Sequence, residues 1–339
     1  MKQNTIQNVR PLFGLLMTVG LLLLGVLTAA VLLTGCVKRE LEMRPAAPEE
    51  GTVEVGVVWP EGADCNAARL LIYDEAGMLN CSEEFSAGEN RFVCTLAAGN
   101  YRLILHNGDA QNVGYAATES HGTAEVYALN ASGQKPSSQD EALAEPHKVY
   151  GIGRHDQGEH FTVTAGETLP LTVTPVRLTR EVHFDFAVTG LDDVKSVVGT
   201  LSGVAPSVLL CTRECRQEAF GLPFEGVPHA PRHGSARVKA GAEPAYFRAT
   251  LELFDLLTRK GSPAGTNGVE AVVTAGDGRS YPVQVDITEA LQQLIDSGGD
   301  VFPVEIPLEI ALEIDPVTAE VRVTVTPWDG GGTGGGDFE

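Results

Sequence analysis

The stretch Val317-Thr318-Ala319-Glu320-Val321-Arg322-Val323-Thr324-Val325-Thr326 alternates apolar and polar residues at every position. In an extended strand, successive side chains point to opposite faces, so this alternation predicts a strand with one buried face. The same period occurs in two further rows: Val53, Val55, Val57 and Trp59, and Tyr281, Val283, Val285 and Ile287. One buried face is typical of antiparallel sheets, so the sequence predicts an all-β fold of antiparallel β-sandwiches.

Shorter apolar runs separated by turn residues predict further strands. Gly, Asn or Asp stands in most of the gaps, as in Ala87-Gly88-Glu89-Asn90, and these residues favour turns. The predicted strands are 68–74, 90–96, 100–106, 123–129, 159–164, 194–203, 245–254 and 268–274. One short helix is predicted at 288–296, because Thr288 is a good N-cap and apolar residues recur on one side after it.

Length and charge limit the classes of protein to which this chain can belong. The chain has 339 residues, enough for two domains of ordinary size. With 24 Lys and Arg against 45 Asp and Glu, the formal net charge is −21. Nucleic-acid backbones and anionic lipid headgroups repel such a chain, so we expect no nucleic-acid partner. A hydrophobic content of 43% excludes wholesale disorder.

Residues 1–35 have the pattern of a bacterial lipoprotein signal peptide. Lys2 and Arg10 give a basic start, and an uncharged, leucine-rich run (12–33) follows. The run ends in Leu33-Thr34-Gly35-Cys36, which matches the lipobox, whose cysteine is acylated and becomes the new N-terminus. The alternative is an uncleaved signal anchor, because about 20 apolar residues can span a bilayer. The cysteine placed directly after the small residues favours lipidation at Cys36.

The two ends of the mature chain are predicted as a tether and a tail. Residues 36–51 read as a lipidated tether, whose prolines stiffen it and whose charges keep it solvated. Two or three fatty acyl chains, such as palmitate, bury enough methylene groups for stable attachment to a membrane. The glycine-rich residues 330–339 read as a flexible tail.

A change of phase marks the predicted domain boundary. Apolar residues occupy odd positions up to Val173 and even positions from Val176 on, and Pro175 lies at the switch. One extra residue moves all following side chains to the opposite face, which suits a chain that leaves one sandwich for the next. A β-bulge inside one long strand gives the same pattern. We predict an N-terminal β-sandwich at 52–175 and a C-terminal β-sandwich at 176–329.

Cysteines give the most specific prediction besides lipidation. The chain has six, and in an exported protein those other than Cys36 can form disulfides. Cys81 and Cys94 lie symmetrically about the turn at Ala87-Gly88, so a hairpin centred there would place them face to face. We predict a candidate disulfide between them. The pairing of the others is left open: Cys65, Cys211 and Cys215.

The sequence predicts no metal, cofactor or catalytic site. Its histidine groups lie in turn-rich segments typical of exposed loops: His147, His155 and His160, and His229 and His233. No second cysteine pair stands at zinc-finger spacing. The nucleophile elbow G-x-S-x-G, the phosphate loop G-x-x-x-x-G-K-[ST] and the zinc motif H-E-x-x-H are absent. We therefore expect that the protein is not an enzyme.

Segments spread along the chain resemble a known family. They are the lipobox followed by Lys38-Arg39-Glu40-Leu41, the strand Gly99-Asn100-Tyr101-Arg102-Leu103-Ile104-Leu105-His106-Asn107, Thr200-Leu201-Ser202-Gly203-Val204-Ala205-Pro206-Ser207-Val208, and Asp277-Gly278-Arg279-Ser280-Tyr281 with Val285-Asp286-Ile287-Thr288. In this order they are similar to the Bacteroides-type surface lipoproteins with fimbrillin-like domains, the fimbrillin-associated lipoproteins of Bacteroidales. The cysteine pairs and the glycine-rich tail are not part of that family's pattern.

The resemblance implies a fold and a function. It implies two tandem transthyretin-like β-sandwich domains in a surface-exposed lipoprotein of the cell outer membrane. Such a protein acts as a fimbrial anchor or accessory subunit in cell adhesion, with other fimbrial subunits as partners joined by strand complementation. The alternative is a surface lipoprotein that captures glycans, which β-sandwiches usually bind through exposed aromatic residues. The aromatic content here is only 6%.

The arginines near the N-terminus predict an anchor rather than a stalk subunit. In the families that this chain resembles, stalk subunits lose their first strand to an arginine-specific protease, and a strand of the next subunit replaces it. Here Arg44 precedes Pro45, whose ring hinders the extended geometry of cleavage. Arg69 begins a predicted core strand, and cleavage at Arg39 would remove no strand. We expect the first strand, Thr52–Trp59, and the lipid to stay in place.

Overall fold

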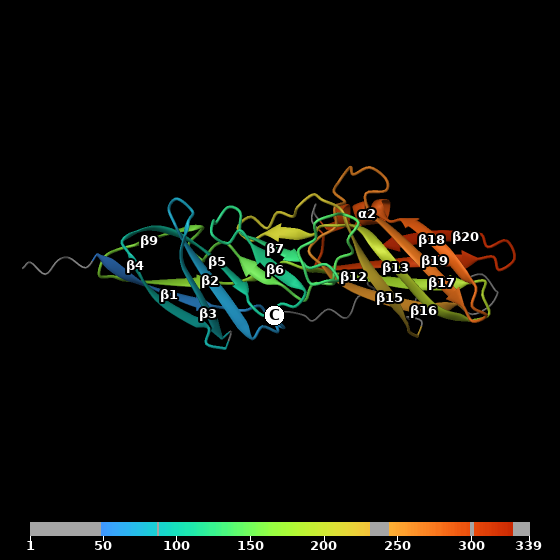
Figure 1. Cartoon of the computed structure of the whole chain (residues 1–339), viewed down its shortest axis with the longest axis horizontal. Coiled ribbons are helices and arrows are strands. Elements are labelled where there is room, and N and C mark those ends of the chain that lie inside the picture. The colour runs from blue at the N-terminus through green and yellow to red at the C-terminus, as the bar shows by residue number, and fades with distance from the viewer. Residues whose placement is uncertain (1–48, 87, 231–243, 299–301, 328–339) are drawn as a thin grey trace, which may run out of the picture. The chain divides into compact units, whose positions relative to one another are not determined.

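The computed structural model describes residues 49–86, 88–230, 244–298 and 302–327 (Figure 1). The predicted signal peptide, the predicted lipidation site Cys36 and the tail 330–339 lie outside these residues, so the predictions for them stay predictions. From Glu50 on, the chain forms a compact unit of its own. None of the described helices is long and apolar enough to cross a membrane.

The N-terminal strands form two sheets around a shared core. Strand β1 (Glu50–Val57) lies in the middle of a three-stranded sheet, parallel to β10 (Thr168–Val173) and antiparallel to β4 (Arg91–Ala97). The second sheet has the order β11-β8-β5-β2-β3, and β9 also pairs with β5. Its strands are β2 (Ala67–Asp74), β3 (Leu79–Ser86), β5 (Gly99–Asn107), β8 (Tyr150–Ile152), β9 (His160–Val163) and β11 (Val176–Arg177).

Alternate side chains of the two sheets fill the first core. The β1 valines, Val53, Val55 and Val57, are at most 4% exposed. They share one apolar cluster with side chains from the facing sheet, such as Leu70 and Leu103. The predicted alternation of the first strand thus points its valines inward, because burying one apolar face of each sheet removes that face from water.

A small sheet connects distant parts of the chain. Its central strand, β7 (Glu125–Ala128), pairs antiparallel with β6 (Val113–Ala116) and with β14 (Ser207–Leu209). Strand β14 comes from much later in the sequence than the other two. Apolar residues of β7 belong to the same buried cluster as the C-terminal strands.

The C-terminal strands form one path of eight, in the order β18-β17-β13-β15-β16-β12-β19-β20 (Figure 1). Strands β12 and β19 are parallel, and the other neighbours are antiparallel. Phe184, Phe186 and Phe224 pack in the core with ring centroids 5.6 to 5.9 Å apart. The strands are β12 (Arg180–Thr189), β13 (Val194–Val204), β15 (Phe220–Pro228), β16 (Ala245–Leu253), β17 (Gly268–Ala275), β18 (Ser280–Asp286), β19 (Glu305–Ile314) and β20 (Val321–Pro327).

Helix α2 (Thr288–Gly298) follows β18 directly. The Asp286 carboxylate accepts a hydrogen bond from the Thr288 backbone N–H at 3.0 Å and so fixes the start of the helix. Leu291 and Ile295 are buried on one side. The helix predicted at 288–296 is confirmed, and so is the predicted fold class of β-sandwiches with one short helix near the C-terminus.

The stretch that begins at Val317 is a strand only in its second half. Strand β20 begins at Val321, and Val317 is 90% exposed. Asp315 Oδ1 accepts hydrogen bonds from the N–H groups of Val317 and Thr318 at 2.8 and 3.2 Å. The strand prediction was therefore wrong over 317–320, because the Asp315 side chain holds a turn that competes with strand pairing.

The phase change at Pro175 falls between strands of different sheets. Strand β10 ends at Val173 beside β1, and β11 directly after Pro175 pairs with β8 in the second N-terminal sheet. Strand β12 then begins at Arg180 in the C-terminal sheet. Apolar side chains of β10 pack in the first core and those of β12 in the second. One long strand with a bulge is thus not the arrangement. The domain limits 52–175 and 176–329 stay a prediction.

Candidate interaction surface

The eight-stranded C-terminal sheet has two edge strands. Its terminal strands are β18 and β20, and each pairs with one neighbour among the described residues, β17 and β19 respectively. The two ends lie near each other, and α2 packs against β20. An edge strand exposes unpaired backbone N–H and C=O groups that can bind another strand. This part of the molecule is therefore a candidate protein-binding surface.

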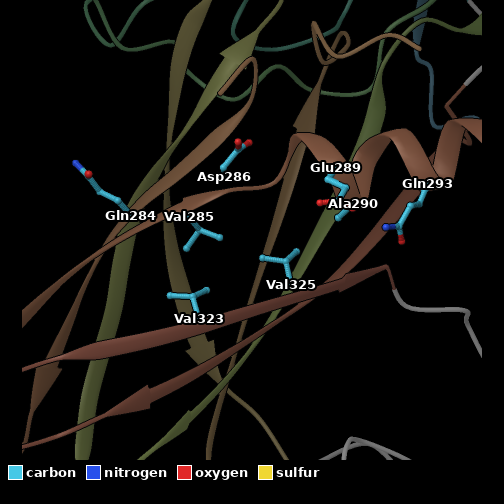
Figure 2. A pocket seen from close by; sticks show the side chains of 8 residues that line it. All are labelled: Gln284, Val285, Asp286, Glu289, Ala290, Gln293, Val323 and Val325. Atoms are coloured by element: carbon cyan, nitrogen blue, oxygen red, sulfur yellow. The ribbon is translucent and has the colours of Figure 1, made fainter. Parts of the chain in front are cut away.

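A groove of about 370 Å³ lies between β18, α2 and β20 (Figure 2). Its floor is formed by Val285 and Ala290, which are 7% and 6% exposed. The β20 residues Val323 and Val325 also line it and are only half-buried. In Figure 2 the three valine side chains gather around the same space. The volume lies within the usual range for small binding clefts, roughly 300–1,000 Å³.

The rim of the groove is polar and negatively charged. It is lined by exposed side chains: Gln284, Asp286, Glu289 and Gln293. Burial tends to raise the pKa of Asp286, but hydrogen bonds from Thr288 and Gly265 outweigh burial and lower this pKa, so the carboxylate stays charged at neutral pH. Glu289 forms no ion pair with another described residue. The groove therefore combines an apolar floor with two acidic side chains at its rim.

The first strand is held on both sides. Strand β1 pairs with β4 and β10, and it covers most of the first strand predicted at Thr52–Trp59. Arg69 lies in β2 between β3 and β5, and its Nε donates a hydrogen bond to Ser82 Oγ at 3.1 Å. Backbone in a paired central strand is not available to a protease. Arg39 and Arg44 lie outside the described residues.

The two cysteines of the candidate disulfide lie in different sheets. Cys81 is on β3, which pairs with β2, and Cys94 is on β4, which pairs with β1. The predicted hairpin between them was wrong, because each strand has its partner elsewhere in the sequence. Both side chains pack against the first core. Burial, with Cys81 and Glu83 nearby, raises the pKa of Cys94 to about 12. Both residues are thiols in the structure, and their disulfide stays a prediction.

The remaining cysteines, Cys65, Cys211 and Cys215, are partly buried free thiols. Burial and the nearby Asp109 and Asp64 raise the pKa of Cys65 to about 11. Burial and Asp255 raise the pKa of Cys215 to about 12. Only the thiolate is a good nucleophile, so a raised pKa makes a cysteine unreactive at neutral pH. Cys211 is also a thiol, half-buried against the second core.

The histidines within the described ranges do not gather at a metal position. His155 is 5% exposed and packs edge-on against Phe161, with ring centroids 5.7 Å apart, so the expectation of an exposed loop residue was wrong there. His160 is exposed at the start of β9, and His233 lies outside the described residues. Within the part of the chain that the structure describes, no three His, Cys, Asp or Glu side chains converge on a metal position.

Aromatic side chains are turned inward. Across residues 49–86, 88–230, 244–298 and 302–327, no Trp, Tyr or Phe is exposed. Trp59 is half-buried and packs edge-on against Tyr150, with ring centroids 6.4 Å apart. The described surface thus lacks the exposed aromatic platform on which sugar rings usually stack.

A known protein-family model matches more than half of the chain. The family is described as a domain of unknown function (DUF5119), and the match covers residues 35–225, more than half of the 339 residues. No functionally curated protein matches the chain in sequence.

Solved structures of surface proteins have a similar fold. A candidate adhesin from Bacteroides thetaiotaomicron is 14% identical, with a TM-score of 0.52, over 83% of this chain and 99% of that one. The fimbrial anchor protein Mfa2 from Porphyromonas gingivalis is 11% identical, with a TM-score of 0.51, over 82% and 97%. A candidate adhesin from Bacteroides ovatus is 16% identical, with a TM-score of 0.51, over 72% and 84%. At such identities the likeness is one of fold.

Proposed function

We propose, from the premise that this chain belongs to the DUF5119 family, that it is a lipid-anchored cell-surface protein serving as an anchor or accessory subunit of a fimbria in cell adhesion. The family description gives no function, so the proposal draws on three other observations. They are the lipobox at Cys36, a fold similar to that of a fimbrial anchor protein, and the state of the first strand. The membrane concerned is the cell outer membrane, and the partners are other fimbrial subunits.

The observation that carries the proposal is the position of β1. This strand begins at Glu50, soon after Cys36, so a lipid on that cysteine would be joined by a short tether to a buried central strand. Its valines are at most 4% exposed, and both of its edges are paired. A lipid attached in this way pulls on the core of the fold rather than on a loose segment.

The pairing of β1 also favours an anchor over a stalk subunit. A stalk subunit would have to lose β1 and offer the vacated place to its neighbour. Cleavage after Arg69 would require β2 to leave both β3 and β5 first. Removing β1 would expose the apolar residues that now pack against its valines, at a cost of about 1.5–3 kcal/mol for each valine.

Glycan capture finds less support than adhesion through protein partners. The described surface has no exposed aromatic ring, and Trp59 packs against Tyr150. Burial raises the pKa of Cys65, Cys94 and Cys215, so none of these three thiols is activated as a nucleophile.

The experiment that tests this proposal maps the N-terminus of the protein extracted from the cell surface. We expect a mature start at acylated Cys36. In cells that carry Cys36→Ala, fimbriae should appear in the medium instead of on the cells, while a Cys65→Ser control should keep them attached. A mature start between residues 60 and 80, or fimbriae that stay attached without Cys36, would contradict the anchor assignment.

A further inference from the structure

We infer that the free edge of β20 receives an extended segment of another subunit, with apolar side chains at alternate positions and a lysine or arginine among them. The inference rests on the proposed fimbrial role and names the surface through which the partner binds. Because β1 keeps its place between β4 and β10, the N-terminal sheet has no vacant strand position beside it. A partner strand therefore needs another edge. Among the edge strands, which include β3, β4, β10 and β11, the pair β18 and β20 has the groove beside it.

The edge of β18 is a poor template. At the β17–β18 turn, the Ala275 N–H donates to the Arg279 carbonyl at 2.8 Å, and the register continues without a shift from Thr274 opposite Ser280 to Gly268 opposite Asp286. Backbone groups alternate in direction along a strand, so those of residues 279, 281, 283 and 285 face β17. The outward set includes Pro282, which has no N–H to donate.

The edge of β20 is an uninterrupted template from Val321 to Val325. At the β19–β20 turn, the Asp315 N–H donates to the Glu320 carbonyl at 2.9 Å, and the register runs regularly to Leu308 opposite Pro327. The same alternation directs the backbone groups of residues 322, 324 and 326 toward β19. The outward N–H and C=O groups are those of Val321, Val323 and Val325, and the proline without an N–H, Pro327, comes only at the end of the strand. These outward groups have no strand partner among the described residues.

The groove beside this edge determines which segment fits. An added strand continues the alternation of β20, so every second side chain falls over the groove between β18 and α2. Val323 and Val325 are only half-buried, and apolar side chains of the added strand would complete their burial. The seven residues of β20 offer an edge of about 20 Å.

Charge selects the partner. Asp286 and Glu289 stand at the rim, and a Lys or Arg on the added strand can reach them. A second copy of this chain would bring the same acidic rim and the same net charge of −21, so self-association through this edge is disfavoured. A basic, alternating segment from a different subunit is favoured.

The test uses the full chain in detergent and a synthetic seven-residue peptide. The peptide has valine at alternate positions, threonine between them and lysine in place of the central threonine. The control peptide has glutamate in place of the lysine. Residue-resolved hydrogen exchange should slow about tenfold at Val321, Val323 and Val325 when the peptide is present at ten times its dissociation constant. The amides of Arg322, Thr324 and Thr326, which already bond to β19, should not change.

Two variants separate main-chain pairing from side-chain packing. Val323→Pro removes one outward N–H and leaves the hydrogen bonds to β19, so it should weaken peptide binding about tenfold or more. Val323→Ala keeps that N–H and should cause a smaller loss. The glutamate peptide should bind about threefold to fivefold more weakly than the lysine peptide. Thermal melting checks that each variant is folded. If Val323→Pro does not fold, the hydrogen-exchange pattern of the wild-type protein with the peptide decides whether β20 is the binding edge.

Several outcomes would overturn the inference. They are the absence of saturable peptide binding, protection on β18 instead of β20, equal effects of the proline and alanine variants, and equal binding of the two peptides. A dimer of the free chain that Val323→Pro dissolves would assign the edge to a second copy instead. The Cys36→Ala protein should bind the peptide as the wild type does, so failure of the lipid-anchor proposal and failure of this inference are distinguishable.

Discussion

Glu125 shows how a single buried charge is stabilised. Its carboxylate is 5% exposed on β7, accepts a hydrogen bond from Arg216 Nε at 3.2 Å and pairs with Lys135. Ser207 Oγ of β14 also donates to it at 3.4 Å. Burial would raise the pKa of Glu125, but the hydrogen bonds and charges of Lys135 and Arg216 outweigh burial and lower it. The folded protein thus binds this proton less readily than the unfolded chain does.

The Glu125→Gln variant tests this balance. At pH 7 it should lower the free energy of unfolding by about 1–2 kcal/mol, because charge-assisted hydrogen bonds are replaced by neutral ones. A lowered folded pKa gives stability that is present above the unfolded value, near 4.5, and is lost as the pH falls through the folded value. Urea unfolding should therefore show a difference that closes in acid. The exposed Glu270→Gln is the matched control, and an equal pH trend in both would contradict the prediction.

Cys81 and Cys94 test a second residue-scale prediction. Although their strands belong to different sheets, both side chains pack against the first core, so a bond between them would join the two sheets. Such a disulfide should stabilise the exported protein by about 3 kcal/mol. Peptide mapping without reduction should find the two residues linked, with Cys65 as an internal free-thiol reference. Finding both as free thiols would rule the bond out.

At the scale of elements, period-two alternation predicted strands well but not their partners. The row that begins at Tyr281 falls on β18 except for its last member, Ile287, and the valines of 53–57 are buried in β1. Strand β19 was not predicted, although its apolar residues alternate regularly from Ile306 to Ile314. Pro307 lies within this run, and a proline inside a run argues against a strand. The parallel pairing of β1 with β10 brings together strands from opposite ends of the first core. Alternation specifies which face is buried, and it carries no signal for the neighbour.

The groove was beyond prediction for the same reason. The segments that contain Val285, Ala290 and Val323 were predicted as a strand, a helix and a strand, respectively. That they enclose a cleft depends on β18 and β20 being the two ends of one path, which is a property of the whole sheet order. The turn at Asp315-Pro316 was also missed, because a side-chain hydrogen bond, not hydrophobicity, sets it.

The turn that follows β12 offers an element-scale prediction. Gly190 has a φ of +87°, and a Cβ there would lie 1.9 Å from the carbonyl oxygen of Ile314 in β19. Gly190→Ala should lower the free energy of unfolding by about 2–4 kcal/mol, because both the backbone and a neighbouring strand would have to move.

Gly62→Ala is the matched control for this turn. Gly62 also has a positive φ, +74°, but a Cβ there would meet nothing within 4 Å. Gly62→Ala should therefore lower the free energy of unfolding only by the backbone strain, about 1–2 kcal/mol. Thermal or urea unfolding of the two variants compares them directly, and equal losses would show that the contact with Ile314 is relieved at little cost.

At the scale of the whole molecule, lipidation at Cys36 is the prediction on which localisation depends. Cells grown with a clickable fatty acid should label the wild-type protein and not the Cys36→Ala variant, because the cysteine of Leu33-Thr34-Gly35-Cys36 is the acceptor. Cys65→Ser should remain labelled and serves as the control. Label that persists in Cys36→Ala would mean that another residue carries the lipid or that the lipobox interpretation is wrong.

The parallel pairing of β1 with β10 has a mechanical consequence. The chain enters β1 at Glu50 and leaves β10 at Val173, and in a parallel pair these two points lie at opposite ends. Tension applied before Glu50 and after Val173 therefore slides the two strands past each other along their axes. The hydrogen bonds along six residue pairs must then yield together, whereas peeling a strand from its end breaks them one after another. A pull on the N-terminal tether against a load held beyond Val173 would thus act on the β1–β10 pair in shear, with its hydrogen bonds resisting together.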